Sequence, residues 1–155
     1  YEAYGIEIAE EALVEAQGFC AEKNVPLNII RGDMRRIPFP SEWFSFAYSF
    51  NAIDFMTKPD TAVSMREMER VLRPDGLCYV NLLSVDDCES WPPFCETSPT
   101  MALLKSEQFA HYEYDEADVY FNAFDILRKA KRLVDKAYEG KRLQQADIEY
   151  IARKR

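Results

Sequence analysis

The chain has 155 residues, a length typical of one domain that buries a sizeable core. Its formal net charge of −8 opposes non-specific attachment to a polyanion, so we expect no nucleic-acid partner and favour a small neutral or cationic ligand. No apolar run reaches the roughly 18 residues of a membrane span, and the first residues carry no targeting pattern. We therefore expect no membrane span and a compact cytoplasmic domain. The sequence does not determine the oligomeric state, and a homodimer is one option.

The four cysteines, Cys20, Cys78, Cys88 and Cys95, show no C-x-x-C spacing. Without a secretory context, this pattern predicts reduced thiols rather than disulfides. A metal pair at Cys88 and Cys95 is the less favoured alternative, and we predict no metal site.

Residues 4–8, YGIEI, are followed by a helical apolar pattern up to Asn24, which predicts a strand that leads into an amphipathic helix. Glu7 lies near the carboxyl end of that strand, where its two oxygens can accept both hydroxyls of a ribose. The alternative is that Glu7 helps to start the helix, since a negative charge there favours the helix dipole.

The stretch from Leu27 to Asn51 predicts two strands, residues 27–30 and 44–50, joined by a proline-containing loop. Asp33 follows Arg31 and Gly32 just past the first of these strands. Ligands of open α/β sheets bind beyond the carboxyl ends of the strands, so Asp33 is a candidate ligand contact. The alternative is ordinary Gly-Asp turn chemistry.

A second helix is predicted after Pro59, with Asp60 as its N-cap. Residues 73–76, RPDG, predict a turn, and residues 77–85 predict a buried strand of a parallel sheet. The helix positions expected to face this sheet share helical spacing: Val63, Met65, Met68, Val71 and Leu72.

From residue 86 to 114 the pattern becomes irregular, which suits a cap over a pocket as well as it suits a surface connection. Trp91 in this segment is a candidate substrate contact. His111, the one histidine, is a candidate proton acceptor, although a surface or hydrogen-bonded histidine is the favoured interpretation. A helix is expected to begin near Asp115, and residues 124–137 have helical apolar spacing, whereas residues 146–155 alternate as a strand does.

Four pieces in this order, GIEIAEEAL, GDMRRIPFP, FSFAYSFNAIDF and REMERVLRPDGLCYVN, together resemble the class I S-adenosylmethionine-dependent methyltransferases. The resemblance is to the small-molecule branch that includes ubiquinone and menaquinone biosynthesis enzymes. It covers residues 4–85 well and the remainder loosely. It implies an α/β, Rossmann-like, doubly wound and mostly parallel sheet with a C-terminal antiparallel hairpin, formed by one methyltransferase domain over residues 1–155 with a substrate cap at 86–114. We therefore expect strand rather than helix over residues 124–137.

The resemblance also implies site residues. Glu7 would hold the cofactor ribose with Ile8 against the adenine, and Asp33 would contact the adenine amino group with Met34 beside it. Residues leaving the next strand would line the methionine end: Ser49, Phe50 and Asn51. Asp54 would orient the acceptor or take its proton, although a plain helix-start or surface carboxylate is the favoured interpretation. No catalytic base is assigned.

The sequence departs from the family pattern at several points. Ser45 stands where an Asp is usual, Asp54 and Phe55 stand where a His pair is common, and Asp75 replaces a Gly. The glycine-rich first strand and loop, central in the family's sheet, are expected to be absent from this chain, which would leave a gap in the core and weaken cofactor binding.

Three functions are compatible with these residues. The first is methyl transfer from S-adenosylmethionine to a small-molecule acceptor. The second is a nicotinamide-dependent oxidoreductase, because Glu7 after a strand equally suits a dinucleotide ribose. The third is a non-catalytic, methyltransferase-like binding protein, suggested by Ser45, Asp54 and the missing loop.

Overall fold

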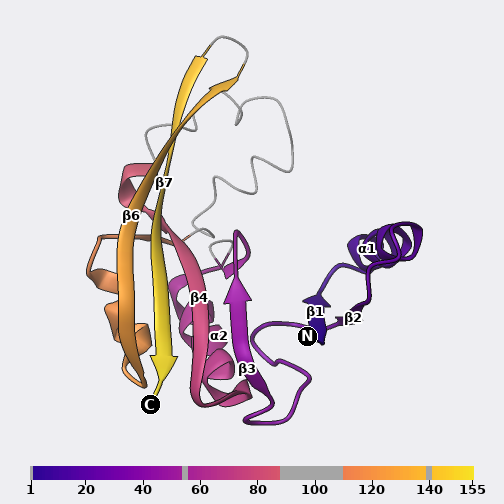
Figure 1. The fold of residues 1–155 in the computed structure, drawn as a ribbon. Helices are drawn as coiled ribbons and strands as arrows, with labels where there is room; N and C mark the ends of the chain where they lie inside the picture. The colour runs from indigo at the N-terminus through magenta and orange to yellow at the C-terminus, as the bar shows by residue number, and fades with distance from the viewer. Residues whose placement is uncertain (1, 54–55, 88–109, 139–140) are drawn as a thin grey trace.

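The computed structural model describes residues 2–53, 56–87, 110–138 and 141–155 (Figure 1). The first half contains four strands and two helices, with a loop and no helix between β2 and β3, and a long antiparallel hairpin follows, as predicted for an α/β, Rossmann-like fold. In chain order the elements are β1 (Ala3–Glu7), α1 (Glu10–Glu22), β2 (Leu27–Arg31), β3 (Phe44–Ser49), α2 (Lys58–Val71), β4 (Leu72–Ser84), η2 (Val85–Asp87), β5 (His111–Tyr112), η4 (Glu116–Phe121), β6 (Phe124–Tyr138) and β7 (Lys141–Lys154).

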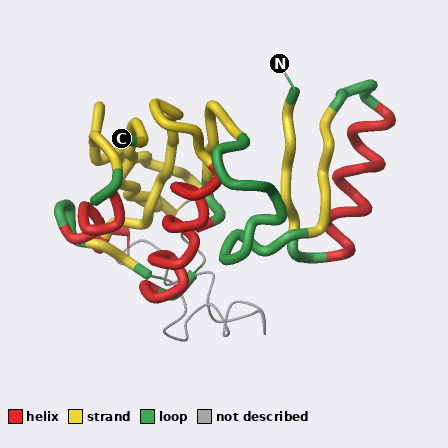
Figure 2. Tube along the Cα trace, turned by 90° about the horizontal axis from the view of Figure 1, so that it is seen from below, coloured by secondary structure: helices red, strands yellow, loops and turns green. Residues whose placement is uncertain are grey.

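The strands fall into two sheets. β1 and β2 pair in parallel as a two-stranded sheet. The larger sheet has the order β3, β4, β7, β6, with β5 paired to the end of β4. β4 is parallel to β3 and antiparallel to β7, so it lies at the centre of the larger sheet. Figure 1 shows the two-stranded sheet with α1 standing beside β3, and Figure 2 shows the loop that joins them.

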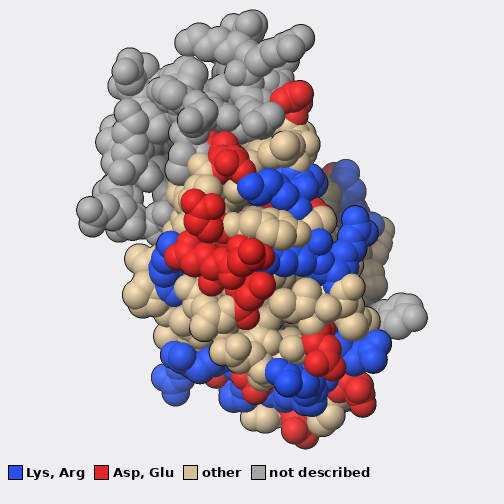
Figure 3. Space-filling model, turned by 90° about the vertical axis from the view of Figure 1, so that its left-hand side faces the viewer, with Lys and Arg blue, Asp and Glu red and all other residues tan. Residues whose placement is uncertain are grey.

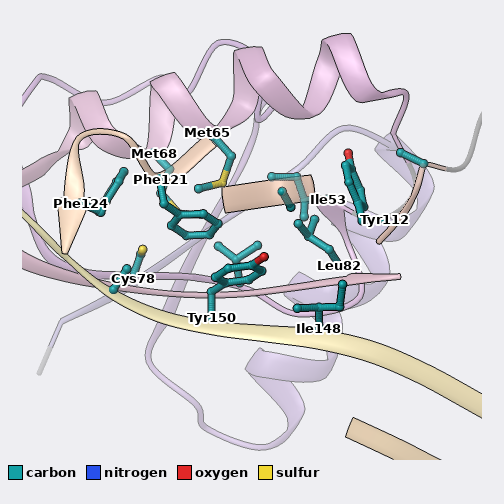
Figure 4. Close-up of a cluster of buried hydrophobic side chains, with 14 of the residues drawn as sticks. Ile53, Met65, Met68, Cys78, Leu82, Tyr112, Phe121, Phe124, Ile148 and Tyr150 are labelled. Carbon is teal, nitrogen blue, oxygen red and sulfur yellow. The ribbon is translucent and has the colours of Figure 1, made fainter. Parts of the chain in front are cut away.

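The core lies between one face of the larger sheet and the layer formed by α2 and η4. Side chains of β4 and β7 alternate in and out of this face, as the period of a strand requires. Met65 and Met68 point from α2 toward Tyr150 and Cys78 of the sheet (Figure 4). The fully buried sheet residues of this core cluster include Cys78, Val80, Leu82, Ile148, Tyr150 and Ala152.

The other face of β3 is open. Ala47 packs against the core, whereas Phe46 and Tyr48 point the opposite way and are 53% and 70% exposed. Their rings stack on one another with centroids 6.1 Å apart. No described element covers this aromatic surface.

Helix α2 begins three residues earlier than the sequence indicated. Its N-cap is Thr57, whose Oγ1 accepts a hydrogen bond from the Asp60 backbone N–H at 3.2 Å. The prediction that Asp60 is the N-cap is therefore wrong. Asp60 lies in the first turn, where its charge still favours the helix dipole, and Pro59 occupies a position that needs no backbone N–H.

The turn predicted at residues 73–76 exists as a bulge inside β4. The pairing shifts from Phe44 opposite Leu72 to Phe46 opposite Leu77, and Asp75 has a φ of 61°. A Cβ at Gly76 would lie 2.8 Å from the Arg73 carbonyl oxygen, so glycine is required there.

The strand prediction for residues 124–137 is confirmed, because β6 and β7 pair from Phe124 with Lys154 to Tyr138 with Lys141. The helix expected near Asp115 is the short 3-10 helix η4. Lys129 of β6 joins η4 to the hairpin: its Nζ lies 2.7 Å from both Asp115 and Asp118 and 4.2 Å from the Tyr114 ring centroid. Figure 3 shows acidic and basic side chains interspersed on this side of the molecule.

The segment predicted as a cap is described at its two ends only, by η2 and β5. Trp91 lies outside the described residues, and so do Cys88, Cys95 and Asp54. Within the described part of the chain, no helix is long and apolar enough to cross a membrane.

Candidate functional site

The tips of β1 and β2 bring Glu7 and Asp33 to the same edge of the two-stranded sheet. The strands are parallel, and Glu7 pairs with Arg31, two residues before Asp33. The Gly32 N–H continues the ladder by donating to the Glu7 carbonyl oxygen at 3.0 Å. A Cβ at Gly32 would lie 3.1 Å from both Ile6 and Pro38 side-chain carbons, so this close approach favours glycine. The sequence prediction that both acids follow neighbouring strand ends is confirmed.

The Glu7 carboxylate lies next to the start of helix α1. Its Oε1 accepts a hydrogen bond from the backbone N–H of Ala9, the N-cap residue, at 2.8 Å, whereas no side chain caps the N–H groups of the first turn. The negative charge of Glu7 stands where the helix dipole favours it, which is compatible with both interpretations of this residue. Oε2 accepts no hydrogen bond from any described residue, so it keeps its capacity for a ligand. Ile8, directly after Glu7, is 57% exposed and offers an apolar surface beside it.

The Asp33 carboxylate is held by Arg35. Its Oδ1 accepts from the Arg35 backbone N–H at 2.8 Å, and its Oδ2 accepts from the Arg35 Nη2 at 2.7 Å. The Arg35 Nε lies 3.1 Å from both oxygens. These hydrogen bonds from Arg35 lower the pKa of the Asp33 carboxyl below its usual range. A ligand amino group would share or displace this guanidinium.

The Met34 side chain is partly buried and packs against the core cluster. At the strand tip, Met34 therefore offers its backbone rather than its side chain to a ligand.

The residues that leave β3 form an ordered turn. Ser49 is buried, and its Oγ accepts a hydrogen bond from the Ile53 N–H at 3.2 Å. Asn51 has a φ of 50°, and it is exposed at the carboxyl end of the strand. Phe50 is 47% exposed, with the Arg132 guanidinium 5.6 Å from its ring centroid.

Asn81 is a site residue that the sequence analysis did not single out. It lies in the middle of β4 and is fully buried, and it makes two hydrogen bonds to Asn51. Its signal in the sequence is an amide inside the apolar run LCYVNLLSV, because a buried polar side chain needs a partner.

The two halves of the candidate site lie on separate sheets. The edge of β1 opposite β2 and the edge of β3 opposite β4 have no strand partner among the described residues. The connection between the sheets holds them together through an aromatic cluster: Phe39 lies 5.3 Å from Tyr4 and 5.0 Å from Phe44 between ring centroids. Within the described ranges no group of three or more His, Cys, Asp or Glu residues is suited to a metal ion.

Comparison with known families identifies the domain. Residues 1–80 match the family described as a methyltransferase domain, which is more than half of the chain. The chain belongs to this methyltransferase family. A comparison with curated protein sequences finds no match.

Solved structures similar to this methyltransferase chain agree on the fold. A SAM-dependent methyltransferase from Methanosarcina mazei matches with a TM-score of 0.75 and 16% identity over 99% of this chain and 82% of its own. A protein solved in work on disulfide-to-thioacetal conversion during echinomycin biosynthesis matches with a TM-score of 0.74 and 13% identity, over 99% of this chain and 66% of its own. The [4+2]-cyclase SpnF matches with a TM-score of 0.67 and 14% identity, over 99% of this chain and 66% of its own. The chain thus spans about two thirds of the length of the last two, and the shared fold alone does not specify a reaction.

Proposed function

We propose that this domain transfers a methyl group from S-adenosylmethionine to a small-molecule acceptor. The observation that carries the proposal is the placement of Glu7 and Asp33 at neighbouring parallel strand tips, with the turn at Ser49 and Asn51 ending a parallel strand of the other sheet. Membership of the methyltransferase family supports methyl transfer over hydride transfer by a nicotinamide cofactor. The name of the Methanosarcina mazei structure supports S-adenosylmethionine as the cofactor.

The residues present suit the parts of that cofactor. The free Oε2 of Glu7 would accept a ribose hydroxyl, and the exposed Ile8 side chain would cover the adenine. Asp33 would accept the adenine amino group while Arg35 moves aside or shares the carboxylate, and the Met34 backbone would lie beside it. The methionine end would meet the turn formed by Ser49, Phe50 and Asn51.

When bound, the cofactor supplies a methyl group on a positively charged sulfur, which is already a strong electrophile. The protein's contribution is to bind and align the two reactants and to exclude water. Alignment of this kind is worth about 7–11 kcal/mol, so no nucleophile of the protein is required. A net charge of −8 favours a positively charged ligand over a nucleic acid.

The finer assignments are part of the same proposal. We place the domain in the small-molecule branch that includes ubiquinone and menaquinone methyltransferases, acting in the cytoplasm as a monomer or homodimer, with residues 86–114 as the cap and with Asp54 and Trp91 as acceptor contacts. We also propose that this sequence lacks the glycine-rich strand that is central in the family's sheet. The support for it is that the edges of β1 and β3, where such a strand would pair, belong to parallel pairs and lack a partner among the described strands.

Isothermal titration of the protein with S-adenosylmethionine tests the proposal. We expect binding by the natural sequence and affinity about tenfold lower for Asp33→Ala, because a hydrogen bond to a charged group contributes about 1.5–3 kcal/mol. Asp125→Ala is the matched control, since Asp125 also faces an arginine, Arg155, but lies on β6. Absence of binding heat, or equal affinities for both variants, would refute the assignment.

A titration with NADH and a methyl-transfer assay separate the other functions. Heat with NADH and none with S-adenosylmethionine would indicate the oxidoreductase. Binding of S-adenosylmethionine without methyl transfer to any compound of a broad metabolite panel would indicate the non-catalytic binding protein.

A further inference from the structure

Asn51 has a backbone conformation that residues other than glycine rarely adopt. Its φ is 50°, in the left-handed region, directly after β3 ends at Ser49. For residues other than glycine this conformation costs about 1–2 kcal/mol, although Asn tolerates it better than most. Asn51 is also exposed, so core packing does not explain why it stays there.

Asn81 supplies the explanation. Its Oδ1 accepts a hydrogen bond from the Asn51 backbone N–H at 2.8 Å, and its Nδ2 donates to the Asn51 Oδ1 at 2.9 Å. The two bonds close a ring between the side chain of one residue and both the backbone and the side chain of the other. The left-handed conformation of Asn51 is therefore fixed from the neighbouring strand.

The burial of Asn81 is costly. Asn81 is fully buried in β4, on the face of the strand opposite to Val80 and Leu82, which belong to the core cluster. An amide at such a position loses its hydrogen bonds to water, and among the described residues the two hydrogen bonds to Asn51 are what replace them. An apolar side chain would serve packing at lower cost, so packing alone does not account for Asn81.

We propose that Asn81 is a positioning residue, which locks the turn after β3 in the shape that receives the cofactor. This inference rests on the proposed function. The lock uses the Asn51 N–H and Oδ1 and leaves Asn51 Nδ2 without a partner among the described residues, so the amide can donate to a carboxylate or other acceptor. The apparent dissociation constant of a ligand rises as the fraction of protein in the competent conformation falls. Loss of the lock should therefore weaken binding without removing any ligand contact.

A double-mutant cycle with isothermal titration of S-adenosylmethionine tests this role. We expect Asn81→Ala to weaken binding about tenfold when residue 51 is Asn, because two hydrogen bonds of about 0.5–1.5 kcal/mol each are lost. In an Asn51→Gly background the same change should weaken binding about threefold or less, because glycine adopts the left-handed region without strain. Equal effects in the two backgrounds would overturn the proposal.

Val71→Ala controls for lost stability. Val71 is the buried last residue of α2, and its carbonyl oxygen accepts from the Trp43 N–H just before β3 begins, at the end of β3 away from Asn51. We expect this variant to lower the melting temperature and to leave the affinity unchanged. A loss of affinity equal to that of Asn81→Ala would reduce Asn81 to a structural role and overturn the proposal.

Amide hydrogen exchange gives a readout that needs no ligand. The exposed Asn51 amide should be protected in the natural sequence and exchange at least about tenfold faster in Asn81→Ala. If S-adenosylmethionine fails to bind the natural sequence, the proposed function is wrong, whereas the exchange data still report whether the lock exists. If the Asn51 amide exchanges equally in both proteins, there is no lock.

Discussion

At the scale of single residues, Arg35 binds the Asp33 carboxylate that the cofactor would use, so the two would compete for it. All four of the described hydrogen bonds to the Asp33 carboxylate come from Arg35, which also reaches Asp60 at 3.5 Å. The Arg35 side chain is 44% exposed, so it can move away into water at modest cost. In the structure the negative charge of Asp33 is thus already paired with the positive charge of Arg35.

Removal of Arg35 should expose this competition. We expect Arg35→Ala to bind S-adenosylmethionine as tightly as the natural sequence or up to about tenfold more tightly, because the carboxylate no longer has to be released. Isothermal titration measures the change, with Arg36→Ala as the control, since only the Arg36 backbone N–H contacts Asp33, at its carbonyl oxygen. Weaker binding of Arg35→Ala would mean that Arg35 itself contacts the ligand.

The Arg35→Ala variant should also change how the affinity for S-adenosylmethionine depends on pH. Hydrogen bonds from Arg35 lower the pKa of the Asp33 carboxyl, so their loss should raise that pKa toward its ordinary value. Protonated Asp33 no longer accepts from an amino group in the same way. In Arg35→Ala the affinity should therefore fall at a higher pH, on acidification, than it does in the natural sequence.

The element that joins the two sheets is the connection from β2 to β3, and α2 anchors it. Glu67 accepts from the Ile37 N–H at 2.8 Å, and Arg70 donates to the Ile37 and Phe39 carbonyl oxygens at 2.8 Å. Glu67 and Arg70 also pair with each other. Three backbone groups of a loop are thus satisfied by two side chains of one helix.

Glu67→Gln should weaken this anchor in a pH-dependent way. The hydrogen bond from Arg70 lowers the pKa of Glu67, so its contribution is present above the ordinary carboxyl pKa and is lost as the pH falls through the lower folded value. Urea unfolding should show a loss of about 1–2 kcal/mol at pH 7 and little difference from the natural sequence in strong acid. Glu69→Gln, on the same helix but outside these contacts, should show neither effect.

At this scale the sequence predicted most elements, and its errors have physical causes. The helical spacing of residues 124–137 is misleading because Leu127 and Leu133 are exposed on β6 and a register shift lies between Ile126 and Arg128. These apolar residues therefore do not share one buried face. The resemblance corrected this prediction because it carries information on tertiary pairing.

The site was predictable where it depends on strand order and unpredictable where it depends on contacts. The placement of Glu7 and Asp33 follows from the strand pattern and is confirmed. The capture of Asp33 by Arg35 and the bonds between Asn81 and Asn51 are side-chain choices that periodicity does not encode.

At the scale of the whole molecule, the buried hydrophobic side chains are unevenly distributed between the two sheets. Leu13 is the one buried hydrophobic side chain described in residues 2–31, whereas the other described buried hydrophobic side chains lie in residues 53–152, in or next to the larger sheet and its two helices. Local stability follows buried apolar contacts, so the two-stranded sheet should open more readily than the larger one.

Hydrogen exchange resolved by residue tests this difference. We expect amides of β1 and β2 to exchange at least about a hundredfold faster than those of β4 and β7. S-adenosylmethionine at about 100 times its dissociation constant should slow the β1 and β2 amides about a hundredfold, because Glu7 and Asp33 lie there. Uniform protection of both sheets would contradict the expectation.

The position of β7 beside β4 has a consequence for synthesis on the ribosome. Tyr79 of β4 and Glu149 of β7 hydrogen-bond across the sheet although 70 residues separate them. At about 5–20 residues per second, translation needs about 4–14 s to cover that interval. During that time β4 lacks β7, the strand that pairs beside it, and its apolar side chains are less well covered. We therefore expect the nascent chain to bind chaperones.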